Sequence, residues 1–175
     1  MKSELIKRIL SSIILIPLSL FFIIKGSILF NFFLVIIFLL SVYEWIKITN
    51  NAIIKVLGIL FLILSFFSFY SLRNNIDDGL LYVVFVLIVC ISTDIGGYTF
   101  GKLFKGPKFT SISPNKTYSG ILGSYVITIF FSIIFIKFFG VNFLENNFIF
   151  IFCLIILIST VSQFGDLLIS YFKRK

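Results

Sequence analysis

Runs of about 20 apolar residues recur along this 175-residue chain, and they constrain its fold more than any other feature. A helix rises about 1.5 Å per residue, so about 20 apolar residues are needed to cross the hydrocarbon of a bilayer. Only 13% of the residues are charged, and the mean hydropathy is +1.15. A soluble domain carries far more polar surface. The sequence therefore predicts an all-α fold, a polytopic membrane helix bundle.

We expect six transmembrane helices that form a single integral membrane domain over residues 1–175. Their predicted ranges are 9–24, 28–46, 53–72, 79–99, 119–139 and 147–165. The first run follows three basic residues, as the apolar part of a signal peptide does. Residues 19–25 hold no small-residue cleavage site, so we predict that this run remains as a span.

The basic residues fall mostly on one side of these spans. When the loops are assigned to alternate sides, all but Lys25, Arg73 and Lys137 of the 15 basic residues lie together. Cytoplasmic loops carry the excess of Lys and Arg in membrane proteins. We therefore expect both termini, and the polar stretch after the fourth span, to face the cytoplasm. The net charge of +8 fits this signal, and the same residues could attract an anionic headgroup or a nucleotide.

Several classes of function are excluded by what the composition lacks. Histidine is absent, so carboxylates, hydroxyls, lysines and water must supply any acid, base or ligand chemistry. Cys90 and Cys153 lie within apolar runs without CxxC spacing, which predicts neither disulfides nor a zinc site. The basic residues are scattered among the spans, so we expect no nucleic-acid partner.

A polar segment, residues 94–117, interrupts the apolar pattern after the fourth span. Ionisable residues at membrane depth are costly and usually functional. Asp94 precedes Gly96 and Gly97, and two interpretations are open. The glycines could allow close helix packing beside a carboxylate in interfacial water, or the carboxylate could be held inside the bundle to orient a lysine or a cation.

Residues 111–117, Ser-Ile-Ser-Pro-Asn-Lys-Thr, are the most specific part of this segment. Ser113 before a proline predicts a turn, and Thr117 can cap the helix that follows. A helix N-terminus beside Lys116 and hydroxyl groups is a natural site for phosphate.

A second polar cluster occupies residues 163–175. Asp166, Ser170 and Arg174 repeat every four residues, so they share one face of a helix. Such a face suits a metal-bound polyphosphate, although an amphipathic helix end with cationic anchors has the same pattern. The two clusters together favour phosphoryl or nucleotidyl transfer at the cytoplasmic face, with Mg²⁺ held by carboxylates and substrate phosphates.

These motifs, in this order, resemble the phosphatidate cytidylyltransferases, which are CDP-diacylglycerol synthases. The resemblance covers essentially the whole chain and rests on Asp94-Ile-Gly-Gly-Tyr98, Ser113-Pro-Asn-Lys-Thr117, Gln163-Phe-Gly-Asp-Leu167, and Ser170 with Lys173-Arg174. It implies an integral protein of the bacterial inner membrane, with its active face in the cytoplasm. Such an enzyme uses Mg²⁺, takes CTP and phosphatidic acid from the membrane lipid, and releases CDP-diacylglycerol and pyrophosphate. A homodimer is compatible with the resemblance.

The resemblance also implies roles for single residues. Asp166 would hold the metal, and with Lys116 and Asp94 it would form the catalytic set. The substrate-binding residues would be Ser113, Asn115, Lys116, Thr117, Ser170, Lys173 and Arg174.

Three features depart from the family pattern. Tyr118-Ser119 stand where the family commonly has a tryptophan and a glutamate, and Ile169 stands where it favours a glutamate. The family signature also continues through Lys-Asp and His-Gly-Gly sequences, whereas this sequence stops at Lys175. The second metal carboxylate would lie in that continuation. We therefore keep the hypothesis of a truncated, partial or inactive member beside the enzyme, and a small membrane transporter subunit as the less favoured one.

Overall fold

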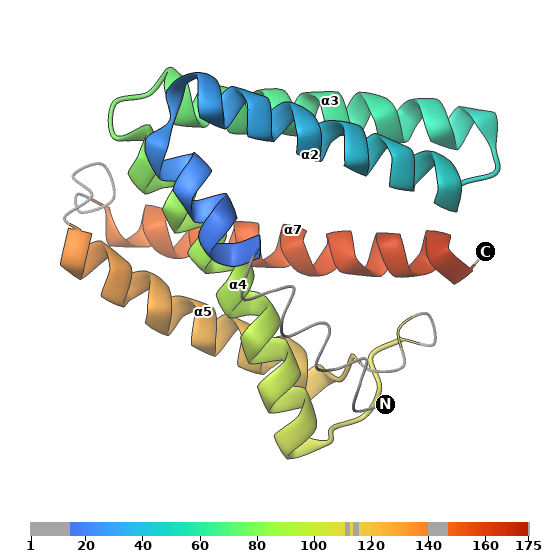
Figure 1. Ribbon diagram of the computed structural model, residues 1–175. Helices are drawn as coiled ribbons and strands as arrows, with labels where there is room; N and C mark the ends of the chain where they lie inside the picture. Colours follow the sequence, from blue (N-terminus) through green and yellow to red (C-terminus); the bar gives the residue numbers. More distant parts are fainter. Residues whose placement is uncertain (1–14, 111–112, 114–115, 140–146, 175) are drawn as a thin grey trace. The chain divides into compact units, whose positions relative to one another are not determined.

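The computed structural model describes residues 15–110, 113, 116–139 and 147–174. These residues form the helix Leu15–Lys25, α2 (Ser27–Ile48), α3 (Ala52–Asn74), α4 (Gly79–Phe104), α5 (Tyr118–Phe139) and α7 (Phe148–Arg174) (Figure 1). The last five are long and apolar enough to cross a bilayer. The predicted all-helical membrane fold is confirmed over this part of the chain. Of the predicted first span, residues 9–14 lie outside the described residues.

Two helices continue beyond the spans predicted for them. The predictions ended at residues 99 and 165, whereas α4 runs to Phe104 and α7 to Arg174. A helix satisfies its own backbone hydrogen bonds, so it can leave the hydrocarbon without changing its geometry. Asp94 and most of the second polar cluster therefore lie on helices. The helix α4 ends just before Gly106 and Pro107, which the sequence marks as helix breakers.

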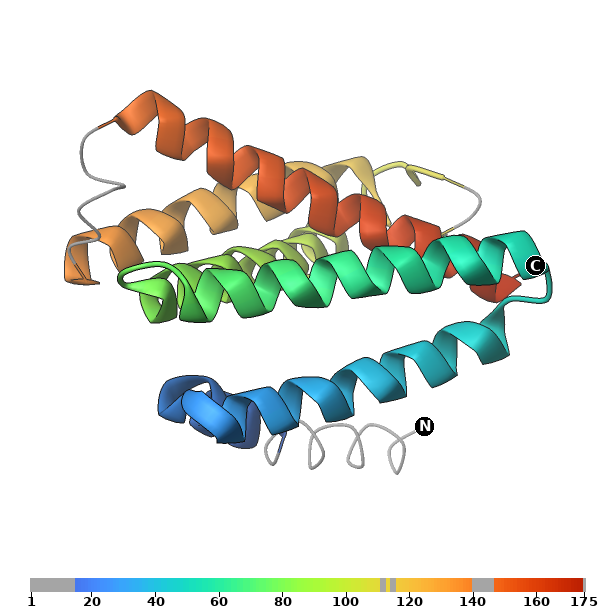
Figure 2. The same ribbon diagram turned by 90° about the horizontal axis from the view of Figure 1, so that it is seen from above.

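The chain divides into two compact units, of which the first ends at Leu80. Within it, α2 and α3 form an antiparallel pair joined by a short connection (Figure 2). The Asn51 side chain caps α3 by accepting a hydrogen bond from the backbone N–H of Ile53 at 2.9 Å. Gly26, with a φ of 65°, separates the helix Leu15–Lys25 from α2. The prediction of one single membrane domain is not tested by this division.

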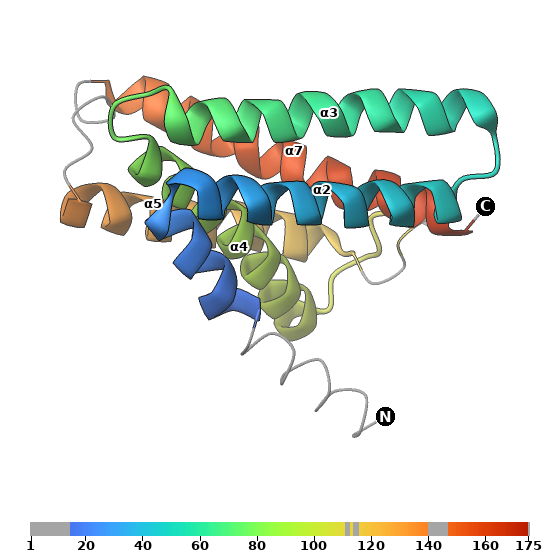
Figure 3. The same ribbon diagram turned by 45° about the horizontal axis from the view of Figure 1, so that its top comes forward.

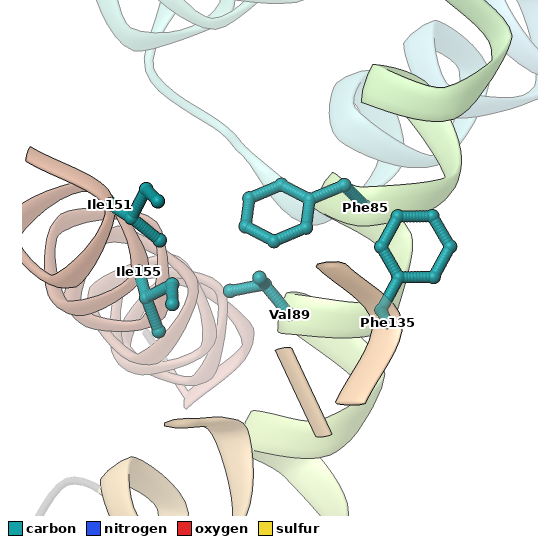
Figure 4. Packing of buried hydrophobic residues seen from close by; sticks show 5 residues of the cluster. All are labelled: Phe85, Val89, Phe135, Ile151 and Ile155. Atoms are coloured by element: carbon teal, nitrogen blue, oxygen red, sulfur yellow. The ribbon is translucent and has the colours of Figure 1, made fainter. Parts of the chain in front are cut away.

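The second unit begins at Leu81 and contains α5, α7 and all of α4 except its first two residues. The helices α5 and α7 run antiparallel against each other, and α4 crosses them obliquely (Figures 1 and 3). Apolar side chains from all three helices meet in its core (Figure 4). They are Phe85, Val89, Phe135, Ile151 and Ile155. In lipid, where burial alone gives little drive for helix association, close packing of this kind holds helices together.

Glycines bring the backbones of α4 and α5 into contact. A Cβ on Gly96 would lie 2.8 Å from both the carbonyl oxygen of Gly123 and the Cα of Ser124, and a Cβ on Gly120 would lie 2.8 Å from the carbonyl oxygen of Gly97. Real Cβ atoms essentially never come so close, so only glycine fits at this crossing. Small residues allow the same close approach between many membrane helices. The close helix packing expected at these glycines is therefore present at Gly96, and both interpretations of Asp94 stay open.

We expect Gly96→Ala to destabilise the second unit, because the added Cβ meets backbone atoms that cannot rotate away. Overpacking of this kind costs about 1–3 kcal/mol. Gly165→Ala in α7 is the matched control, since nothing lies within 4 Å of its Cβ position. Both changes raise the helix propensity by the same amount. The difference between their Tm values therefore reports the contact of the added Cβ with α5. The apparent Tm in detergent should fall for Gly96→Ala and not for Gly165→Ala, and equal values would contradict the crossing.

Candidate functional site

A cavity of about 270 Å³ lies within the second unit, between the three helices and the loop before α5. Its walls combine carboxylates, a lysine and hydroxyls with small residues. The lining residues are Thr93, Asp94, Gly97, Tyr98, Ser113, Lys116, Thr117, Gly120, Ile121, Ser124, Gln163 and Asp166. Five residues predicted from two distant parts of the sequence therefore share one cavity, namely Asp94, Ser113, Lys116, Thr117 and Asp166.

The loop before α5 is folded by its own backbone hydrogen bonds. The N–H of Lys116 donates to the carbonyl oxygen of Ser113 at 3.0 Å, which closes the turn that the sequence predicts there. The N–H of Phe109 donates to the carbonyl oxygen of Lys116 at 2.8 Å. These bonds fix the backbone of Lys116 at the wall of the cavity.

Thr117 caps α5, as its sequence position predicts. Its Oγ1 accepts a hydrogen bond from the backbone N–H of Gly120 at 3.1 Å. Ser119 lies in the same turn, and its Oγ accepts a hydrogen bond from the N–H of Gly106 at 3.3 Å. The capped turn forms part of the cavity wall, and helix N-termini favour anions through their free N–H groups and the helix dipole.

Lys116 joins this loop to α7. Its Nζ lies 3.1 Å from Oδ2 of Asp166 and donates to the carbonyl oxygen of Gln163 at 3.2 Å. The Asp166 side chain is 53% exposed, and an ion pair as exposed as this one adds only about 0.2–1 kcal/mol to stability. The contact therefore matters for position, because it holds a positive and a negative group on one cavity.

A network of hydroxyl groups lies beneath the cavity. The Thr93 hydroxyl is 2.9 Å from Oγ of Ser159 and 3.0 Å from Oγ1 of Thr128, and all three side chains are buried. The side-chain amide of Gln163 donates to Oγ of Ser124 at 2.7 Å. Because buried polar groups need partners, this network fixes how α4, α5 and α7 pack.

The residues of this network were not predicted as site residues from the sequence. A signal for them exists in α5, where Gly120, Ser124, Thr128 and Ser132 recur every four residues within an apolar helix. This spacing places them on one face. All four are buried, so the stripe marks the side of α5 that packs against its neighbours.

The other predicted residues do not line this cavity. Ser170, Lys173 and Arg174 lie on α7, one to two turns beyond Asp166, and none of them is in its wall. Asn115 lies outside the described residues. The roles that the resemblance gives to these residues stay predictions.

The oxygen donors of the cavity fit Mg²⁺. This ion is usually held by one or two carboxylates, with water and substrate phosphates completing its shell. Asp94 and Asp166 are the two carboxylates in the wall. Within the part of the chain that the structure describes, no three His, Cys, Asp or Glu side chains group together as a metal site. A metal here would therefore depend on phosphate oxygens as well as on protein.

The fold and the cavity together define a class of protein: a helical membrane protein with a cavity lined by carboxylates, a lysine and hydroxyls. Comparison with known proteins is more specific, because residues 49–175 match the model of the cytidylyltransferase family. The chain therefore belongs to the cytidylyltransferase family.

Curated relatives support this assignment. The chain is 34% identical to the phosphatidate cytidylyltransferase of Rickettsia bellii, over 99% of this chain and 77% of that protein. It is 38% identical to the phosphatidate cytidylyltransferase of Staphylococcus haemolyticus, over 63% of this chain and 41% of that protein. The enzyme of the same name from Bacillus subtilis is 34% identical over 67% of this chain and 43% of its own length. No solved structure matches the chain significantly.

We expect Thr117→Val to loosen the N-terminus of α5, because valine cannot accept the hydrogen bond from Gly120. Loss of such a cap costs about 1 kcal/mol. Trypsin should then cleave faster at the lysines of residues 102–108, while Thr117→Ser should resist trypsin as the parent does. A cleavage rate in Thr117→Val equal to that in Thr117→Ser would contradict the capping role.

Proposed function

We propose that this chain is a phosphatidate cytidylyltransferase, which transfers a cytidylyl group from CTP to phosphatidic acid. Membership of the cytidylyltransferase family and the activity named for its relatives support the reaction. The single observation that carries the proposal is the meeting of Lys116 and Asp166, from two separate sequence motifs, at 3.1 Å on one cavity. A charged pair of this kind suits a substrate rich in phosphate.

In this reaction a phosphate oxygen of the lipid attacks the α-phosphorus of CTP. A new P–O bond forms, and the bond to the β-phosphate breaks with its electron pair leaving on pyrophosphate. Such transfers depend on positioning and charge neutralisation more than on acid or base strength. This explains how a chain without histidine could catalyse the step.

The groups at the cavity suit these tasks. The Lys116 ammonium would donate hydrogen bonds to phosphate oxygens, and the N-terminus of α5 would supply backbone N–H groups beside Ser113 and Thr117. Because the Lys116–Asp166 pair is accessible to solvent, exchange of one partner for a phosphate oxygen costs little.

Mg²⁺ is the cofactor we assign to the site. Asp166 would hold it, with Asp94 on the opposing helix as the second carboxylate of the cavity. When bound, the ion neutralises charge on the polyphosphate and on the leaving pyrophosphate. If Asp94 does not contact the metal, its carboxylate would instead orient Lys116 and the water in the cavity.

The site belongs, on this proposal, to the cytoplasmic face of a bacterial inner membrane. The excess of basic residues on one side of the spans and the bacterial origin of the relatives support this location. CTP is then available from the cytoplasm and phosphatidic acid from the adjoining leaflet.

We expect Asp166→Asn to lower turnover by about 10²- to 10³-fold, as loss of one preorganised charge at a transition state does. The assay follows labelled CTP into extractable lipid, in membranes that contain the chain, phosphatidic acid and Mg²⁺. Asp77→Asn is the matched control, because Asp77 is exposed and lies in the first unit.

Unchanged turnover in Asp166→Asn would contradict the metal assignment. A folded parent chain without CTP-dependent labelling of phosphatidic acid would contradict the proposed activity. That result would favour the hypothesis of a partial or inactive member.

The proposed orientation predicts opposite labelling of two exposed positions. In a Cys90→Ala, Cys153→Ala background, Lys108→Cys should react with an impermeant maleimide only after intact cells are permeabilised. Asp77→Cys should react without permeabilisation, because the loop at residues 75–78 faces outward in this orientation. The reverse pattern would place the site on the outer face and contradict the proposal.

A further inference from the structure

A second cavity, of about 190 Å³, adjoins the candidate site in the same unit. It lies between the loop before α5 and the facing sides of α5 and α7. Its walls are formed by Phe109, Lys116, Ile121, Tyr125, Thr160, Gln163, Phe164 and Leu167. Lys116, Ile121 and Gln163 also line the first cavity, so the two cavities share one wall.

The walls of the two cavities differ in chemistry. The first carries Asp94 and Asp166, whereas five of the eight residues around the second are aromatic or aliphatic. The hydroxyls in the second cavity bond to protein: the Thr160 hydroxyl donates to the carbonyl oxygen of Ile156 at 2.7 Å and lies 2.9 Å from the hydroxyl of Tyr125. Since each hydroxyl has one proton, Tyr125 donates to Thr160 and neither has a proton left for a ligand.

An apolar group fits this second cavity better than a nucleobase does. A base needs several directed donors and acceptors, and the side-chain amide of Gln163 already donates to Ser124. Tyr125 lies about 10 Å along α5 from its first residue, at about 1.5 Å per residue. The cavity therefore reaches from the loop about two turns along α5.

The shared lysine links the two environments. Its Nζ is held by Asp166 and Gln163, both on α7, and its side chain borders the apolar cavity as well as the polar one. A ligand with an anionic group beside Lys116 could thus place an apolar tail in the second cavity. The same anionic group would face the metal and the nucleotide in the first cavity.

We propose that the second cavity receives the first carbons of an acyl chain of phosphatidic acid, with the lipid phosphate beside Lys116 and CTP in the first cavity. This inference rests on the proposed function and adds to it a separate place for each substrate. The wall formed by Lys116, Ile121 and Gln163 is then where the attacking phosphate oxygen meets the α-phosphorus.

Filling the second cavity tests this assignment. In Leu167→Trp the larger ring occupies the space of the lipid, so the KM for phosphatidic acid should rise by about tenfold, while the KM for CTP stays unchanged. Leu168→Trp is the matched control, because Leu168 is 57% exposed and lines neither cavity. Phe109→Trp fills the cavity from the opposite wall and should also raise the KM for phosphatidic acid and leave the KM for CTP unchanged. Agreement between the two variants would show that the effect is not a folding defect of one of them.

A binding measurement separates this inference from the proposed activity. Phosphatidic acid with a diazirine in its acyl chain should label the parent on α5 or α7 without CTP. Labelling should be lost in Leu167→Trp and kept in Leu168→Trp. The parent chain could show no turnover and still be labelled, with the labelling lost in Leu167→Trp. That result would support the lipid site and contradict only the proposed activity.

Two results would overturn the inference. A rise in the KM for CTP in Leu167→Trp, with the KM for the lipid unchanged, would place the nucleobase in the second cavity. Equal KM values and equal photolabelling in Leu167→Trp and Leu168→Trp would show that nothing binds there.

Discussion

The backbone contact between α4 and α5 is the constraint on which the second unit depends. Glycines at the crossing let the two helices approach more closely than any side chain would permit. That approach brings Thr93 of α4 within hydrogen-bond distance of Thr128 on α5. It also places Asp94 and the N-terminus of α5 on one cavity. A bulkier residue at Gly96 would therefore change the site through the fold, without touching a substrate.

Sequence patterns predicted the elements better than their packing. The apolar runs identified the long helices, and local chemistry identified the turn at Ser113 and the cap at Thr117. The helices α4 and α7 continue beyond the predicted spans, because polarity marks where a helix leaves the hydrocarbon rather than where it ends. The spacing of small residues on α5 signals a packed face, but the partners of its hydroxyls and the second cavity could not be predicted, since they arise only when three helices meet.

The site places its charges where the membrane helices end. Lys116 stands in the loop that precedes α5, and Asp166 stands near the polar end of α7. Their contact needs no deep burial, and an exposed pair can exchange partners cheaply. Beneath them, uncharged hydroxyls satisfy one another, and among the described residues the Ser132 hydroxyl is the buried side-chain group left without a partner. This division places the charged cavity beside a mostly apolar one.

On both proposals, Lys116 serves both substrates from the wall between two cavities. Acylation of individual lysines, measured by mass spectrometry on the full chain in vesicles, tests this role. CTP with Mg²⁺ and phosphatidic acid should each slow the acylation of Lys116, while Lys55 in the first unit should react at the same rate throughout. Acylation of Lys116 that neither substrate slows would contradict the account.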